Sequence, residues 1–136
     1  MAEPREKLFE MPITSDEDVI MARQKVRAIA QQLGFSMLDQ TRVVTAVSEL
    51  GRNIVVHAGK GDMNVFRAEE GERSGISIIF SDNGPGITDV DQALTDGYSS
   101  VGSMGLGLKG ASRLVDRFDI DSNPGAGTTI TNTKWL

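Results

Sequence analysis

The chain lacks several features that define other classes of protein. Its 136 residues include no cysteine, which excludes a disulfide framework and a thiolate metal site. No apolar run approaches the roughly 20 residues that a membrane-spanning helix needs. The polar N-terminus, Met-Ala-Glu-Pro-Arg-Glu-Lys, has no apolar segment of the kind found in signal peptides. We therefore expect a cytoplasmic protein.

Basic side chains are outnumbered, and aromatic side chains are scarce. Fourteen Lys and Arg against nineteen Asp and Glu give a net charge of −5, which argues against non-specific binding to nucleic acids. Aromatic residues make up 5% of the chain, while the apolar share of 39% and the charged share of 24% are ordinary for a globular protein. The length predicts one domain over residues 1–136, large enough to form a core without covalent staples.

Hydrophobic periodicity predicts a strand and two helices in the first part of the chain. The apolar stretch of residues 8–13 indicates the strand. Ser15 begins a helix-start signal, and apolar residues then recur at helical spacing until Gly34 ends the run. A second helix is expected from about residue 36 to about residue 57. Its buried stripe consists of Val43, Val47, Leu50 and Ile54.

The rest of the chain reads as strands with further helices between them. The elements expected in chain order are a strand at 63–67, a polar hairpin turn at 69–75, a strand at 76–80, a short helix near 89–94, a helix at 106–116, and a closing hairpin of 117–122 and 128–134. Together these elements predict an α/β two-layer sandwich of the α+β type. Helices are expected to cover one face of a mixed sheet.

Glu49 and Asn53 stand four residues apart on the second predicted helix. At this spacing the two side chains share one face, which is offset from the buried stripe, so both are able to point into a cleft. A carboxylate there is able to take a proton from a hydroxyl or a water, and an amide oxygen suits Mg²⁺. Taken alone, the pair is better explained as two solvated side chains; the motifs that follow favour the chemical interpretation.

Asp82 follows the strand predicted at 76–80 and precedes Asn-Gly-Pro-Gly. A strand-end aspartate is able to accept a hydrogen bond from the exocyclic amine of adenine. Gly84 and Gly86 would let the backbone pass close to the base. An ordinary turn from strand to loop would also explain the Asn-Gly pair.

The segment Gly105-Leu106-Gly107-Leu108 opens the helix predicted at 106–116. Free N–H groups and the dipole at a helix start favour an anion, such as a phosphate. A Walker-type site is not indicated, because no Gly-Lys-Ser/Thr follows these glycines. A Rossmann site is not indicated either, because no βαβ unit surrounds them.

Three nitrogen-bearing side chains near the second helix have open roles. His57, the only histidine, stands at a predicted helix C-terminus, where positive charge is favoured; we expect a structural role, because no further metal ligands lie nearby. Lys60, between two glycines, fits either a phosphate contact or a solvated loop lysine. Arg52 fits equally a phosphate or partner contact and a surface ion pair.

In combination, these motifs resemble those of the GHKL superfamily, the ATP-binding domain shared by DNA gyrase, MutL and sensor histidine kinases. Glu49 with Asn53 resembles its N box, and residues 82–86 and 105–108 resemble its two glycine boxes. Gly127-Thr128 resembles its late threonine motif. Within the superfamily, the chain is similar from residue 14 onward to the small serine kinases of bacterial partner-switching pathways. The stretches that carry this similarity are 48–54, 58–61, 96–99, 118–120 and 133–136.

The resemblance implies a Bergerat-type ATP-binding fold, the use of ATP with Mg²⁺, and a role for each matching residue. Glu49 would be the general base and Asn53 the Mg²⁺ ligand. Asp82 would bind the adenine amine, with Thr128 supporting it through a water. The remaining matching positions would line the base or present backbone N–H groups to the phosphates: Gly84, Gly86, Gly105, Leu106, Gly107 and Leu108.

The branch of the superfamily is narrowed by two features. Autophosphorylation on histidine is not expected, because the sole histidine lies in the ATP-domain helix. A gyrase-like lid is not expected, because only eighteen residues separate Gly86 from Gly105. The resemblance instead implies a kinase for a serine on a STAS-domain antagonist, which binds a PP2C-type phosphatase when released. An anti-sigma factor that sequesters a sigma factor is the alternative, and a nucleotide-free adaptor is disfavoured because the chemical residues are all present.

Overall fold

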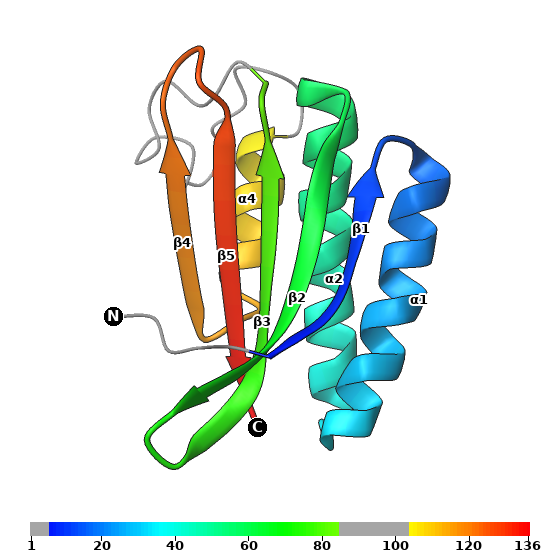
Figure 1. Cartoon of the computed structure of the whole chain (residues 1–136), viewed down its shortest axis with the longest axis vertical. Helices are drawn as coiled ribbons and strands as arrows, with labels where there is room; N and C mark the ends of the chain where they lie inside the picture. Colours follow the sequence, from blue (N-terminus) through cyan, green and yellow to red (C-terminus); the bar gives the residue numbers. More distant parts are fainter. Residues whose placement is uncertain (1–5, 85–103) are drawn as a thin grey trace.

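The computed structural model describes residues 6–84 and 104–136, which form two layers. One layer is a five-stranded sheet, and helices α1, α2 and α4 lie against one of its faces with α2 in the middle (Figure 1). The elements in chain order are β1 (Lys7–Ile13), α1 (Asp16–Leu33), α2 (Met37–Asn53), the π-helical turn η1 (Ile54–Ala58), β2 (Gly61–Glu70), β3 (Arg73–Asp82), α4 (Met104–Ser112), β4 (Arg117–Ser122) and β5 (Thr128–Trp135). The predicted two-layer sandwich is confirmed.

The strand order is β1-β2-β3-β5-β4, and each neighbouring pair in it is antiparallel. The expectation of a mixed sheet is therefore wrong for the described strands. Two helices separate β1 from β2, so the chain enters β2 from the end at which β1 finished and runs in the opposite direction. The single helix α4 makes β4 parallel to β3, but β5 folds back and lies between them.

The first two helices begin where the sequence predicts, and α1 also ends there. The Ser15 hydroxyl accepts a hydrogen bond from the Asp18 N–H at 3.2 Å, and the Ser36 hydroxyl caps α2 in the same way from the Asp39 N–H at 3.1 Å. Gly34 ends α1 with φ of 99°, a conformation that favours glycine. These local features fix both ends of α1 and the start of α2.

The core lies between the helices and the sheet. The predicted stripe of α2 is buried throughout, and it packs with side chains of the helix-facing side of the sheet, among them Ile13, Met63, Val65, Ile76, Ile78 and Phe80. Leu108 of α4 is 1% exposed and belongs to the same cluster. Within the described ranges, no helix combines the length and apolar character that crossing a membrane requires.

Predicted boundaries are corrected at the end of α2 and at the hairpin between β2 and β3. The α-helix α2 ends at Asn53 and continues as η1, in which the Gly59 N–H donates to the Ile54 carbonyl at 2.7 Å. The hairpin turn is shorter than predicted, because β2 and β3 pair up to Glu70 and Arg73 and the positive φ of Gly71 permits a tight connection. The helix near 89–94 lies outside the described residues.

Helix α4 ends at Ser112, four residues before the predicted end at 116. The last turn tightens, since the Arg113 N–H donates to the Gly110 carbonyl and the Leu114 N–H to the Ala111 carbonyl. The chain is thereby released into the turn before β4.

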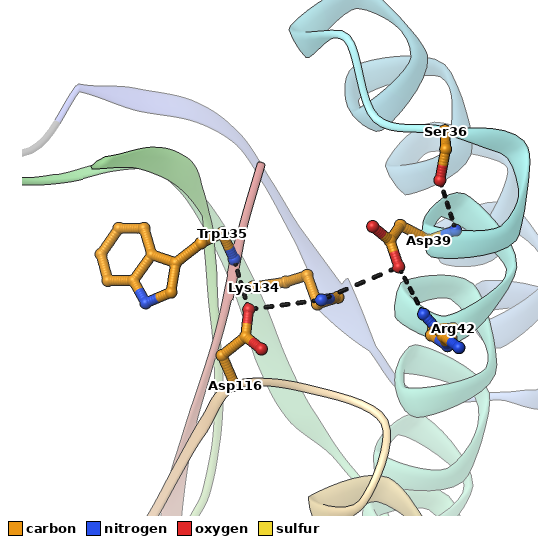
Figure 2. Close-up of polar contacts among 6 residues, drawn as sticks. All are labelled: Ser36, Asp39, Arg42, Asp116, Lys134 and Trp135. Atoms are coloured by element: carbon orange, nitrogen blue, oxygen red, sulfur yellow. Dashed lines mark hydrogen bonds and ion pairs between the residues drawn. The ribbon is translucent and has the colours of Figure 1, made fainter. Parts of the chain in front are cut away.

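Lys134 connects the two layers at the end of the molecule opposite to the one where β3 finishes (Figure 2). Its Nζ lies 3.3 Å from Asp116 Oδ2 and 3.7 Å from Asp39 Oδ1 at the start of α2, and its side chain is 13% exposed. Asp116 Oδ2 also accepts a hydrogen bond from the Trp135 N–H at 2.7 Å. Burial raises the pKa of Asp116, but the hydrogen bonds from Trp135 and Lys134 and the charges of Lys134 and Arg73 outweigh it, so the pKa is lowered.

Candidate active site

One end of the molecule gathers the elements that carry the predicted site residues. The end of β3, the start of β5, the turn η1 and the beginning of α4 all lie there, at the upper end in Figure 1.

Asp82 and Thr128 are direct cross-strand partners in the pairing of β3 with β5. Cross-strand partners share one face of a sheet, and these two continue the alternation of the buried residues Phe80 and Ile130 on the helix-facing side. Thr128 is 8% exposed, and its hydroxyl lies 2.8 Å from that of Ser122. The structure thus brings together two residues that are far apart in the sequence.

The loop after β3 is held close to η1 by a glycine. The Gly84 N–H donates to Asp82 Oδ1 at 2.8 Å, which fixes the carboxylate. A Cβ atom at Gly84 would lie only 2.7 Å from Ala58 Cβ. On the other side, Gly127 has a φ of +89°, and a Cβ there would collide with the Asp82 carbonyl oxygen. Both glycines therefore permit the close backbone approach that surrounds Asp82.

Glu49 and Asn53 lie on the flank of α2 that faces away from α1. The opposite flank is marked by Gly51, where an added Cβ atom would lie 3.2 Å from Val19 Cγ2 of α1. At 3.6 residues per turn, both Glu49 and Asn53 are rotated by about 160° from Gly51, toward the side where α4 contacts α2. Both side chains are half-buried. They share one face, as the sequence predicts.

The side-chain amide of Asn53 could offer its oxygen to a metal ion, while its nitrogen still lacks a hydrogen-bond acceptor. Its Nδ2 atom is buried and has no hydrogen-bond partner, and leaving a buried donor unpaired costs about 1–3 kcal/mol. Among the described residues, no group of three or more His, Cys, Asp or Glu could hold a metal ion. An Mg²⁺ ion here would therefore depend on the Asn53 amide, phosphate oxygens and waters, which is the mixed ligand set that Mg²⁺ prefers. The residues present fit such an ion.

His57 lies one turn beyond Asn53, in η1. Its Nε2 atom is buried without a hydrogen-bond partner, and burial lowers the pKa of the ring. The helix C-terminus was expected to favour a positive charge at this position, but desolvation favours the neutral ring instead. The sequence offers no signal for this, because the burial comes from the tertiary arrangement.

The remaining predicted residues are only partly brought together. Gly105, Leu106 and Gly107 belong to the first part of α4, whose start lies at the same end of the molecule (Figure 1). Leu108 is a core residue by its side chain. Lys60 is exposed and lines, together with Asp82, a cavity of about 340 Å³ at the strand ends. Gly86 lies outside the described residues.

The structural role of Ala58 and the π-helical turn are not predicted from the sequence. Ala58 supports the loop after Asp82 through its contact with Gly84. The only sequence signal is the Gly59-Lys60-Gly61 segment, which ends the helix but does not reveal that its last turn is widened. Widened turns of this kind often occur at functional sites.

The class of protein follows from these motifs and a family comparison. The family model for histidine kinase-, DNA gyrase B-, and HSP90-like ATPases matches residues 38–136, which include the N-box, glycine-box and threonine-motif residues. The chain belongs to this ATPase family.

Curated relatives identify the type within that family. Serine/threonine-protein kinase RsbT of Bacillus subtilis (strain 168) is 44% identical over 124 residues, which cover 91% of this chain and 93% of that protein. The anti-sigma F factor of Pasteuria penetrans is 34% identical over 136 residues, which cover 94% of this chain and 90% of that protein. The predicted resemblance to the serine kinases of partner-switching pathways is confirmed, and the chain is a serine/threonine-protein kinase of the RsbT type.

A solved structure agrees with the fold. The crystal structure of the RsbU and RsbW domains of Rv1364c from Mycobacterium tuberculosis matches with a TM-score of 0.62 at 23% identity. The match covers 93% of this chain and 32% of that longer chain. At this level of identity the likeness concerns the fold alone, and it agrees with the predicted ATP-binding sandwich.

Proposed function

We propose that this kinase transfers the γ-phosphate of ATP to a serine of a STAS-domain antagonist and, when released from it, binds a PP2C-type phosphatase in the cytoplasm. The observation that carries the proposal is the high identity to RsbT over nearly the whole chain. Two placements support it: Glu49 and Asn53 belong to the last turns of α2, and Asp82 pairs with Thr128 where β3 ends and β5 begins. These ends of α2, β3 and β5 lie at the same end of the molecule (Figure 1).

The adenine end of the site would be formed by β3 and β5. Asp82 would accept a hydrogen bond from the exocyclic amine of adenine, since its Oδ1 is already fixed by the Gly84 N–H. Thr128, its cross-strand partner, would support the same amine through a water. Gly84 and Gly86 would line the base, because a backbone without side chains is able to approach it closely. A side chain at Gly84 would also disturb the packing against Ala58.

The phosphate end would be formed by α2 and α4. Asn53 would hold Mg²⁺ through its amide oxygen. Bound Mg²⁺ would neutralise the charge that develops on the phosphate oxygens. The backbone N–H groups of residues 105–108 would bind phosphate oxygens at the beginning of α4. Lys60 would add a positive charge from the loop before β2.

Glu49 would act as the general base. It stands one helical turn before Asn53 on the same flank of α2, so a serine hydroxyl presented near the metal would come within its reach. A carboxylate able to accept this proton would raise the nucleophilicity of the hydroxyl. Positioning would supply most of the remaining acceleration.

Transfer of label from γ-labelled ATP to a purified STAS-domain protein tests the proposal. Wild-type protein should label the STAS protein in the presence of Mg²⁺. Glu49→Ala should abolish transfer, a loss of about 10²–10⁴-fold, and leave ATP affinity largely unchanged in calorimetry. Glu72→Ala, an exposed glutamate in the hairpin at the other end of the molecule, serves as the matched control and should retain wild-type activity. No transfer by the wild type to any STAS partner would contradict the proposal.

The alternative is an anti-sigma factor that sequesters a sigma factor and phosphorylates its antagonist. The similarity of the chain to anti-sigma F factors supports this second candidate function. A pull-down with an ATP analogue and Mg²⁺ separates the two functions. Recovery of a STAS protein and a PP2C-type phosphatase is expected, whereas recovery of a sigma factor would favour the alternative.

A further inference from the structure

Two buried polar atoms without partners lie one helical turn apart at the end of the α2 segment. They are Asn53 Nδ2 and His57 Nε2. Together with Asn132 Oδ1, which is enclosed between α2 and the sheet, they are the buried side-chain polar atoms without a partner in the described part of the chain. Two of the three therefore fall within five residues of one another, beside the proposed metal ligand.

The two atoms are chemically complementary. An amide nitrogen is only a donor, and a neutral imidazole has one nitrogen that accepts. Burial lowers the pKa of His57, so the neutral ring is the favoured form. An acceptor at Nε2 would match the donor at Asn53 Nδ2.

The spacing allows the pair to meet. Residues four apart on a helix are neighbours on its surface, with Cβ atoms about 5–6 Å apart. His57 stands within the π-helical turn, where the Gly59 N–H reaches back five residues to the Ile54 carbonyl and the helix is wider. Neither atom has a hydrogen-bond partner, so the two side chains stand one turn apart without a hydrogen bond between them in this structure.

We propose that His57 is a positioning residue for the metal ligand: with nucleotide bound, its Nε2 accepts a hydrogen bond from Asn53 Nδ2, directly or through one water, and so turns the Asn53 amide oxygen toward Mg²⁺. The inference rests on the proposed role of Asn53. An amide is able to present either of its two ends, and a fixed acceptor behind the nitrogen selects the oxygen for the metal. Groups that orient metal ligands in this way commonly change metal affinity by about 10–100-fold when they are removed.

Calorimetric titration of the full chain with ADP, once with Mg²⁺ and once with EDTA, tests the inference. His57→Leu removes the acceptor and should lower ADP affinity about tenfold with Mg²⁺ and leave it unchanged with EDTA. His57→Gln keeps an acceptor oxygen on a side chain of similar reach and should stay within about threefold of the wild type. A loss of equal size in both conditions would mean a merely structural role and would overturn the inference, as would no loss in either.

Asn53→Ala separates this inference from the proposed function. It should remove the dependence of ADP affinity on Mg²⁺. If Asn53→Ala keeps the full dependence, Asn53 is not the metal ligand and both proposals fail at that residue. If Asn53→Ala loses the dependence while His57→Leu keeps it, only the positioning role of His57 is wrong.

A measurement on the wild-type chain does not depend on the folding of a variant. In ¹⁵N-labelled protein, addition of ADP with Mg²⁺ should shift the His57 Nε2 resonance and one proton of the Asn53 side-chain amide, and ADP with EDTA should not. Unchanged resonances of both groups with Mg²⁺ would overturn the inference.

Discussion

Replacing Gly84 by alanine tests whether the loop after β3 depends on close packing against η1. A Cβ atom at this position would lie 2.7 Å from Ala58 Cβ and 3.1 Å from Ala58 Cα. It would also lie 3.1 Å from Asp82 Oδ1, the atom that accepts the hydrogen bond from the Gly84 N–H. Carbon atoms pack best at about 3.5–4.0 Å, so the loop or η1 must move by roughly 1 Å.

The expected cost follows from this overlap. One extra methyl group in a packed site typically destabilises a protein by about 1–3 kcal/mol. The φ of Gly84 is not positive, so the cost arises from packing rather than from backbone strain. In a chain of 136 residues, each kcal/mol lowers Tm by roughly 3–5 °C. Because the movement displaces Asp82, affinity for ADP should fall as well.

Urea unfolding and ADP calorimetry measure the two effects. The variants are Gly84→Ala, Ala58→Gly and the double variant, in which the closest contact is absent. The double variant should recover part of the lost stability, with a coupling energy of about 1 kcal/mol or more. Gly110→Ala in α4 is the matched control. No described atom lies within 4 Å of a Cβ there, so this change should stabilise the chain by about 0.5–1 kcal/mol.

Either of two results would refute close packing of Gly84 against Ala58 as the cause. One is a Gly84→Ala protein whose free energy of unfolding matches the wild type within about 0.5 kcal/mol, the range of changes that touch nothing. The other is additivity of the Ala58 and Gly84 changes, because independent sites share no contact.

Two further predictions concern stability alone. Lys134→Met should destabilise the fold by about 1–2 kcal/mol at neutral pH, between the values for surface and buried ion pairs, because it leaves Asp39 and Asp116 without their shared cation. Because the pKa of Asp116 is lowered in the folded state, its ionised carboxylate stabilises the fold fully above the unfolded pKa of 3.8, and this stabilisation is lost as the pH falls through the folded-state pKa. The difference in unfolding free energy between variant and wild type, measured in urea, should therefore shrink below pH 3.8. A difference that stays constant with pH would contradict the assignment. Ser15→Ala should cost about 1 kcal/mol in thermal unfolding by removing the α1 cap, whereas Ser15→Asp, which keeps an acceptor for the Asp18 N–H, should cost little; equal losses would exclude capping as the cause.

The sequence alone determined those parts of the fold that depend on near neighbours. The cap at Ser15, the stop at Gly34 and the buried stripe of α2 each rest on residues within one or two turns, and the structure agrees with all three. Alternation along β3 likewise places Asp82 at the end of a strand. The shared flank of Glu49 and Asn53 follows from the helical period alone.

Tertiary structure decided the features that join distant segments. Insertion of β5 between β3 and β4 makes Thr128 the cross-strand partner of Asp82 and makes the described sheet antiparallel. The contact between Ala58 and Gly84, and the burial of His57 Nε2, depend on how the α2 segment sits against the sheet. The physical reason is range: capping and periodicity act over a few residues, whereas strand order and burial minimise the free energy of the whole chain, so the residues that meet around Asp82 carry no local signal of their meeting.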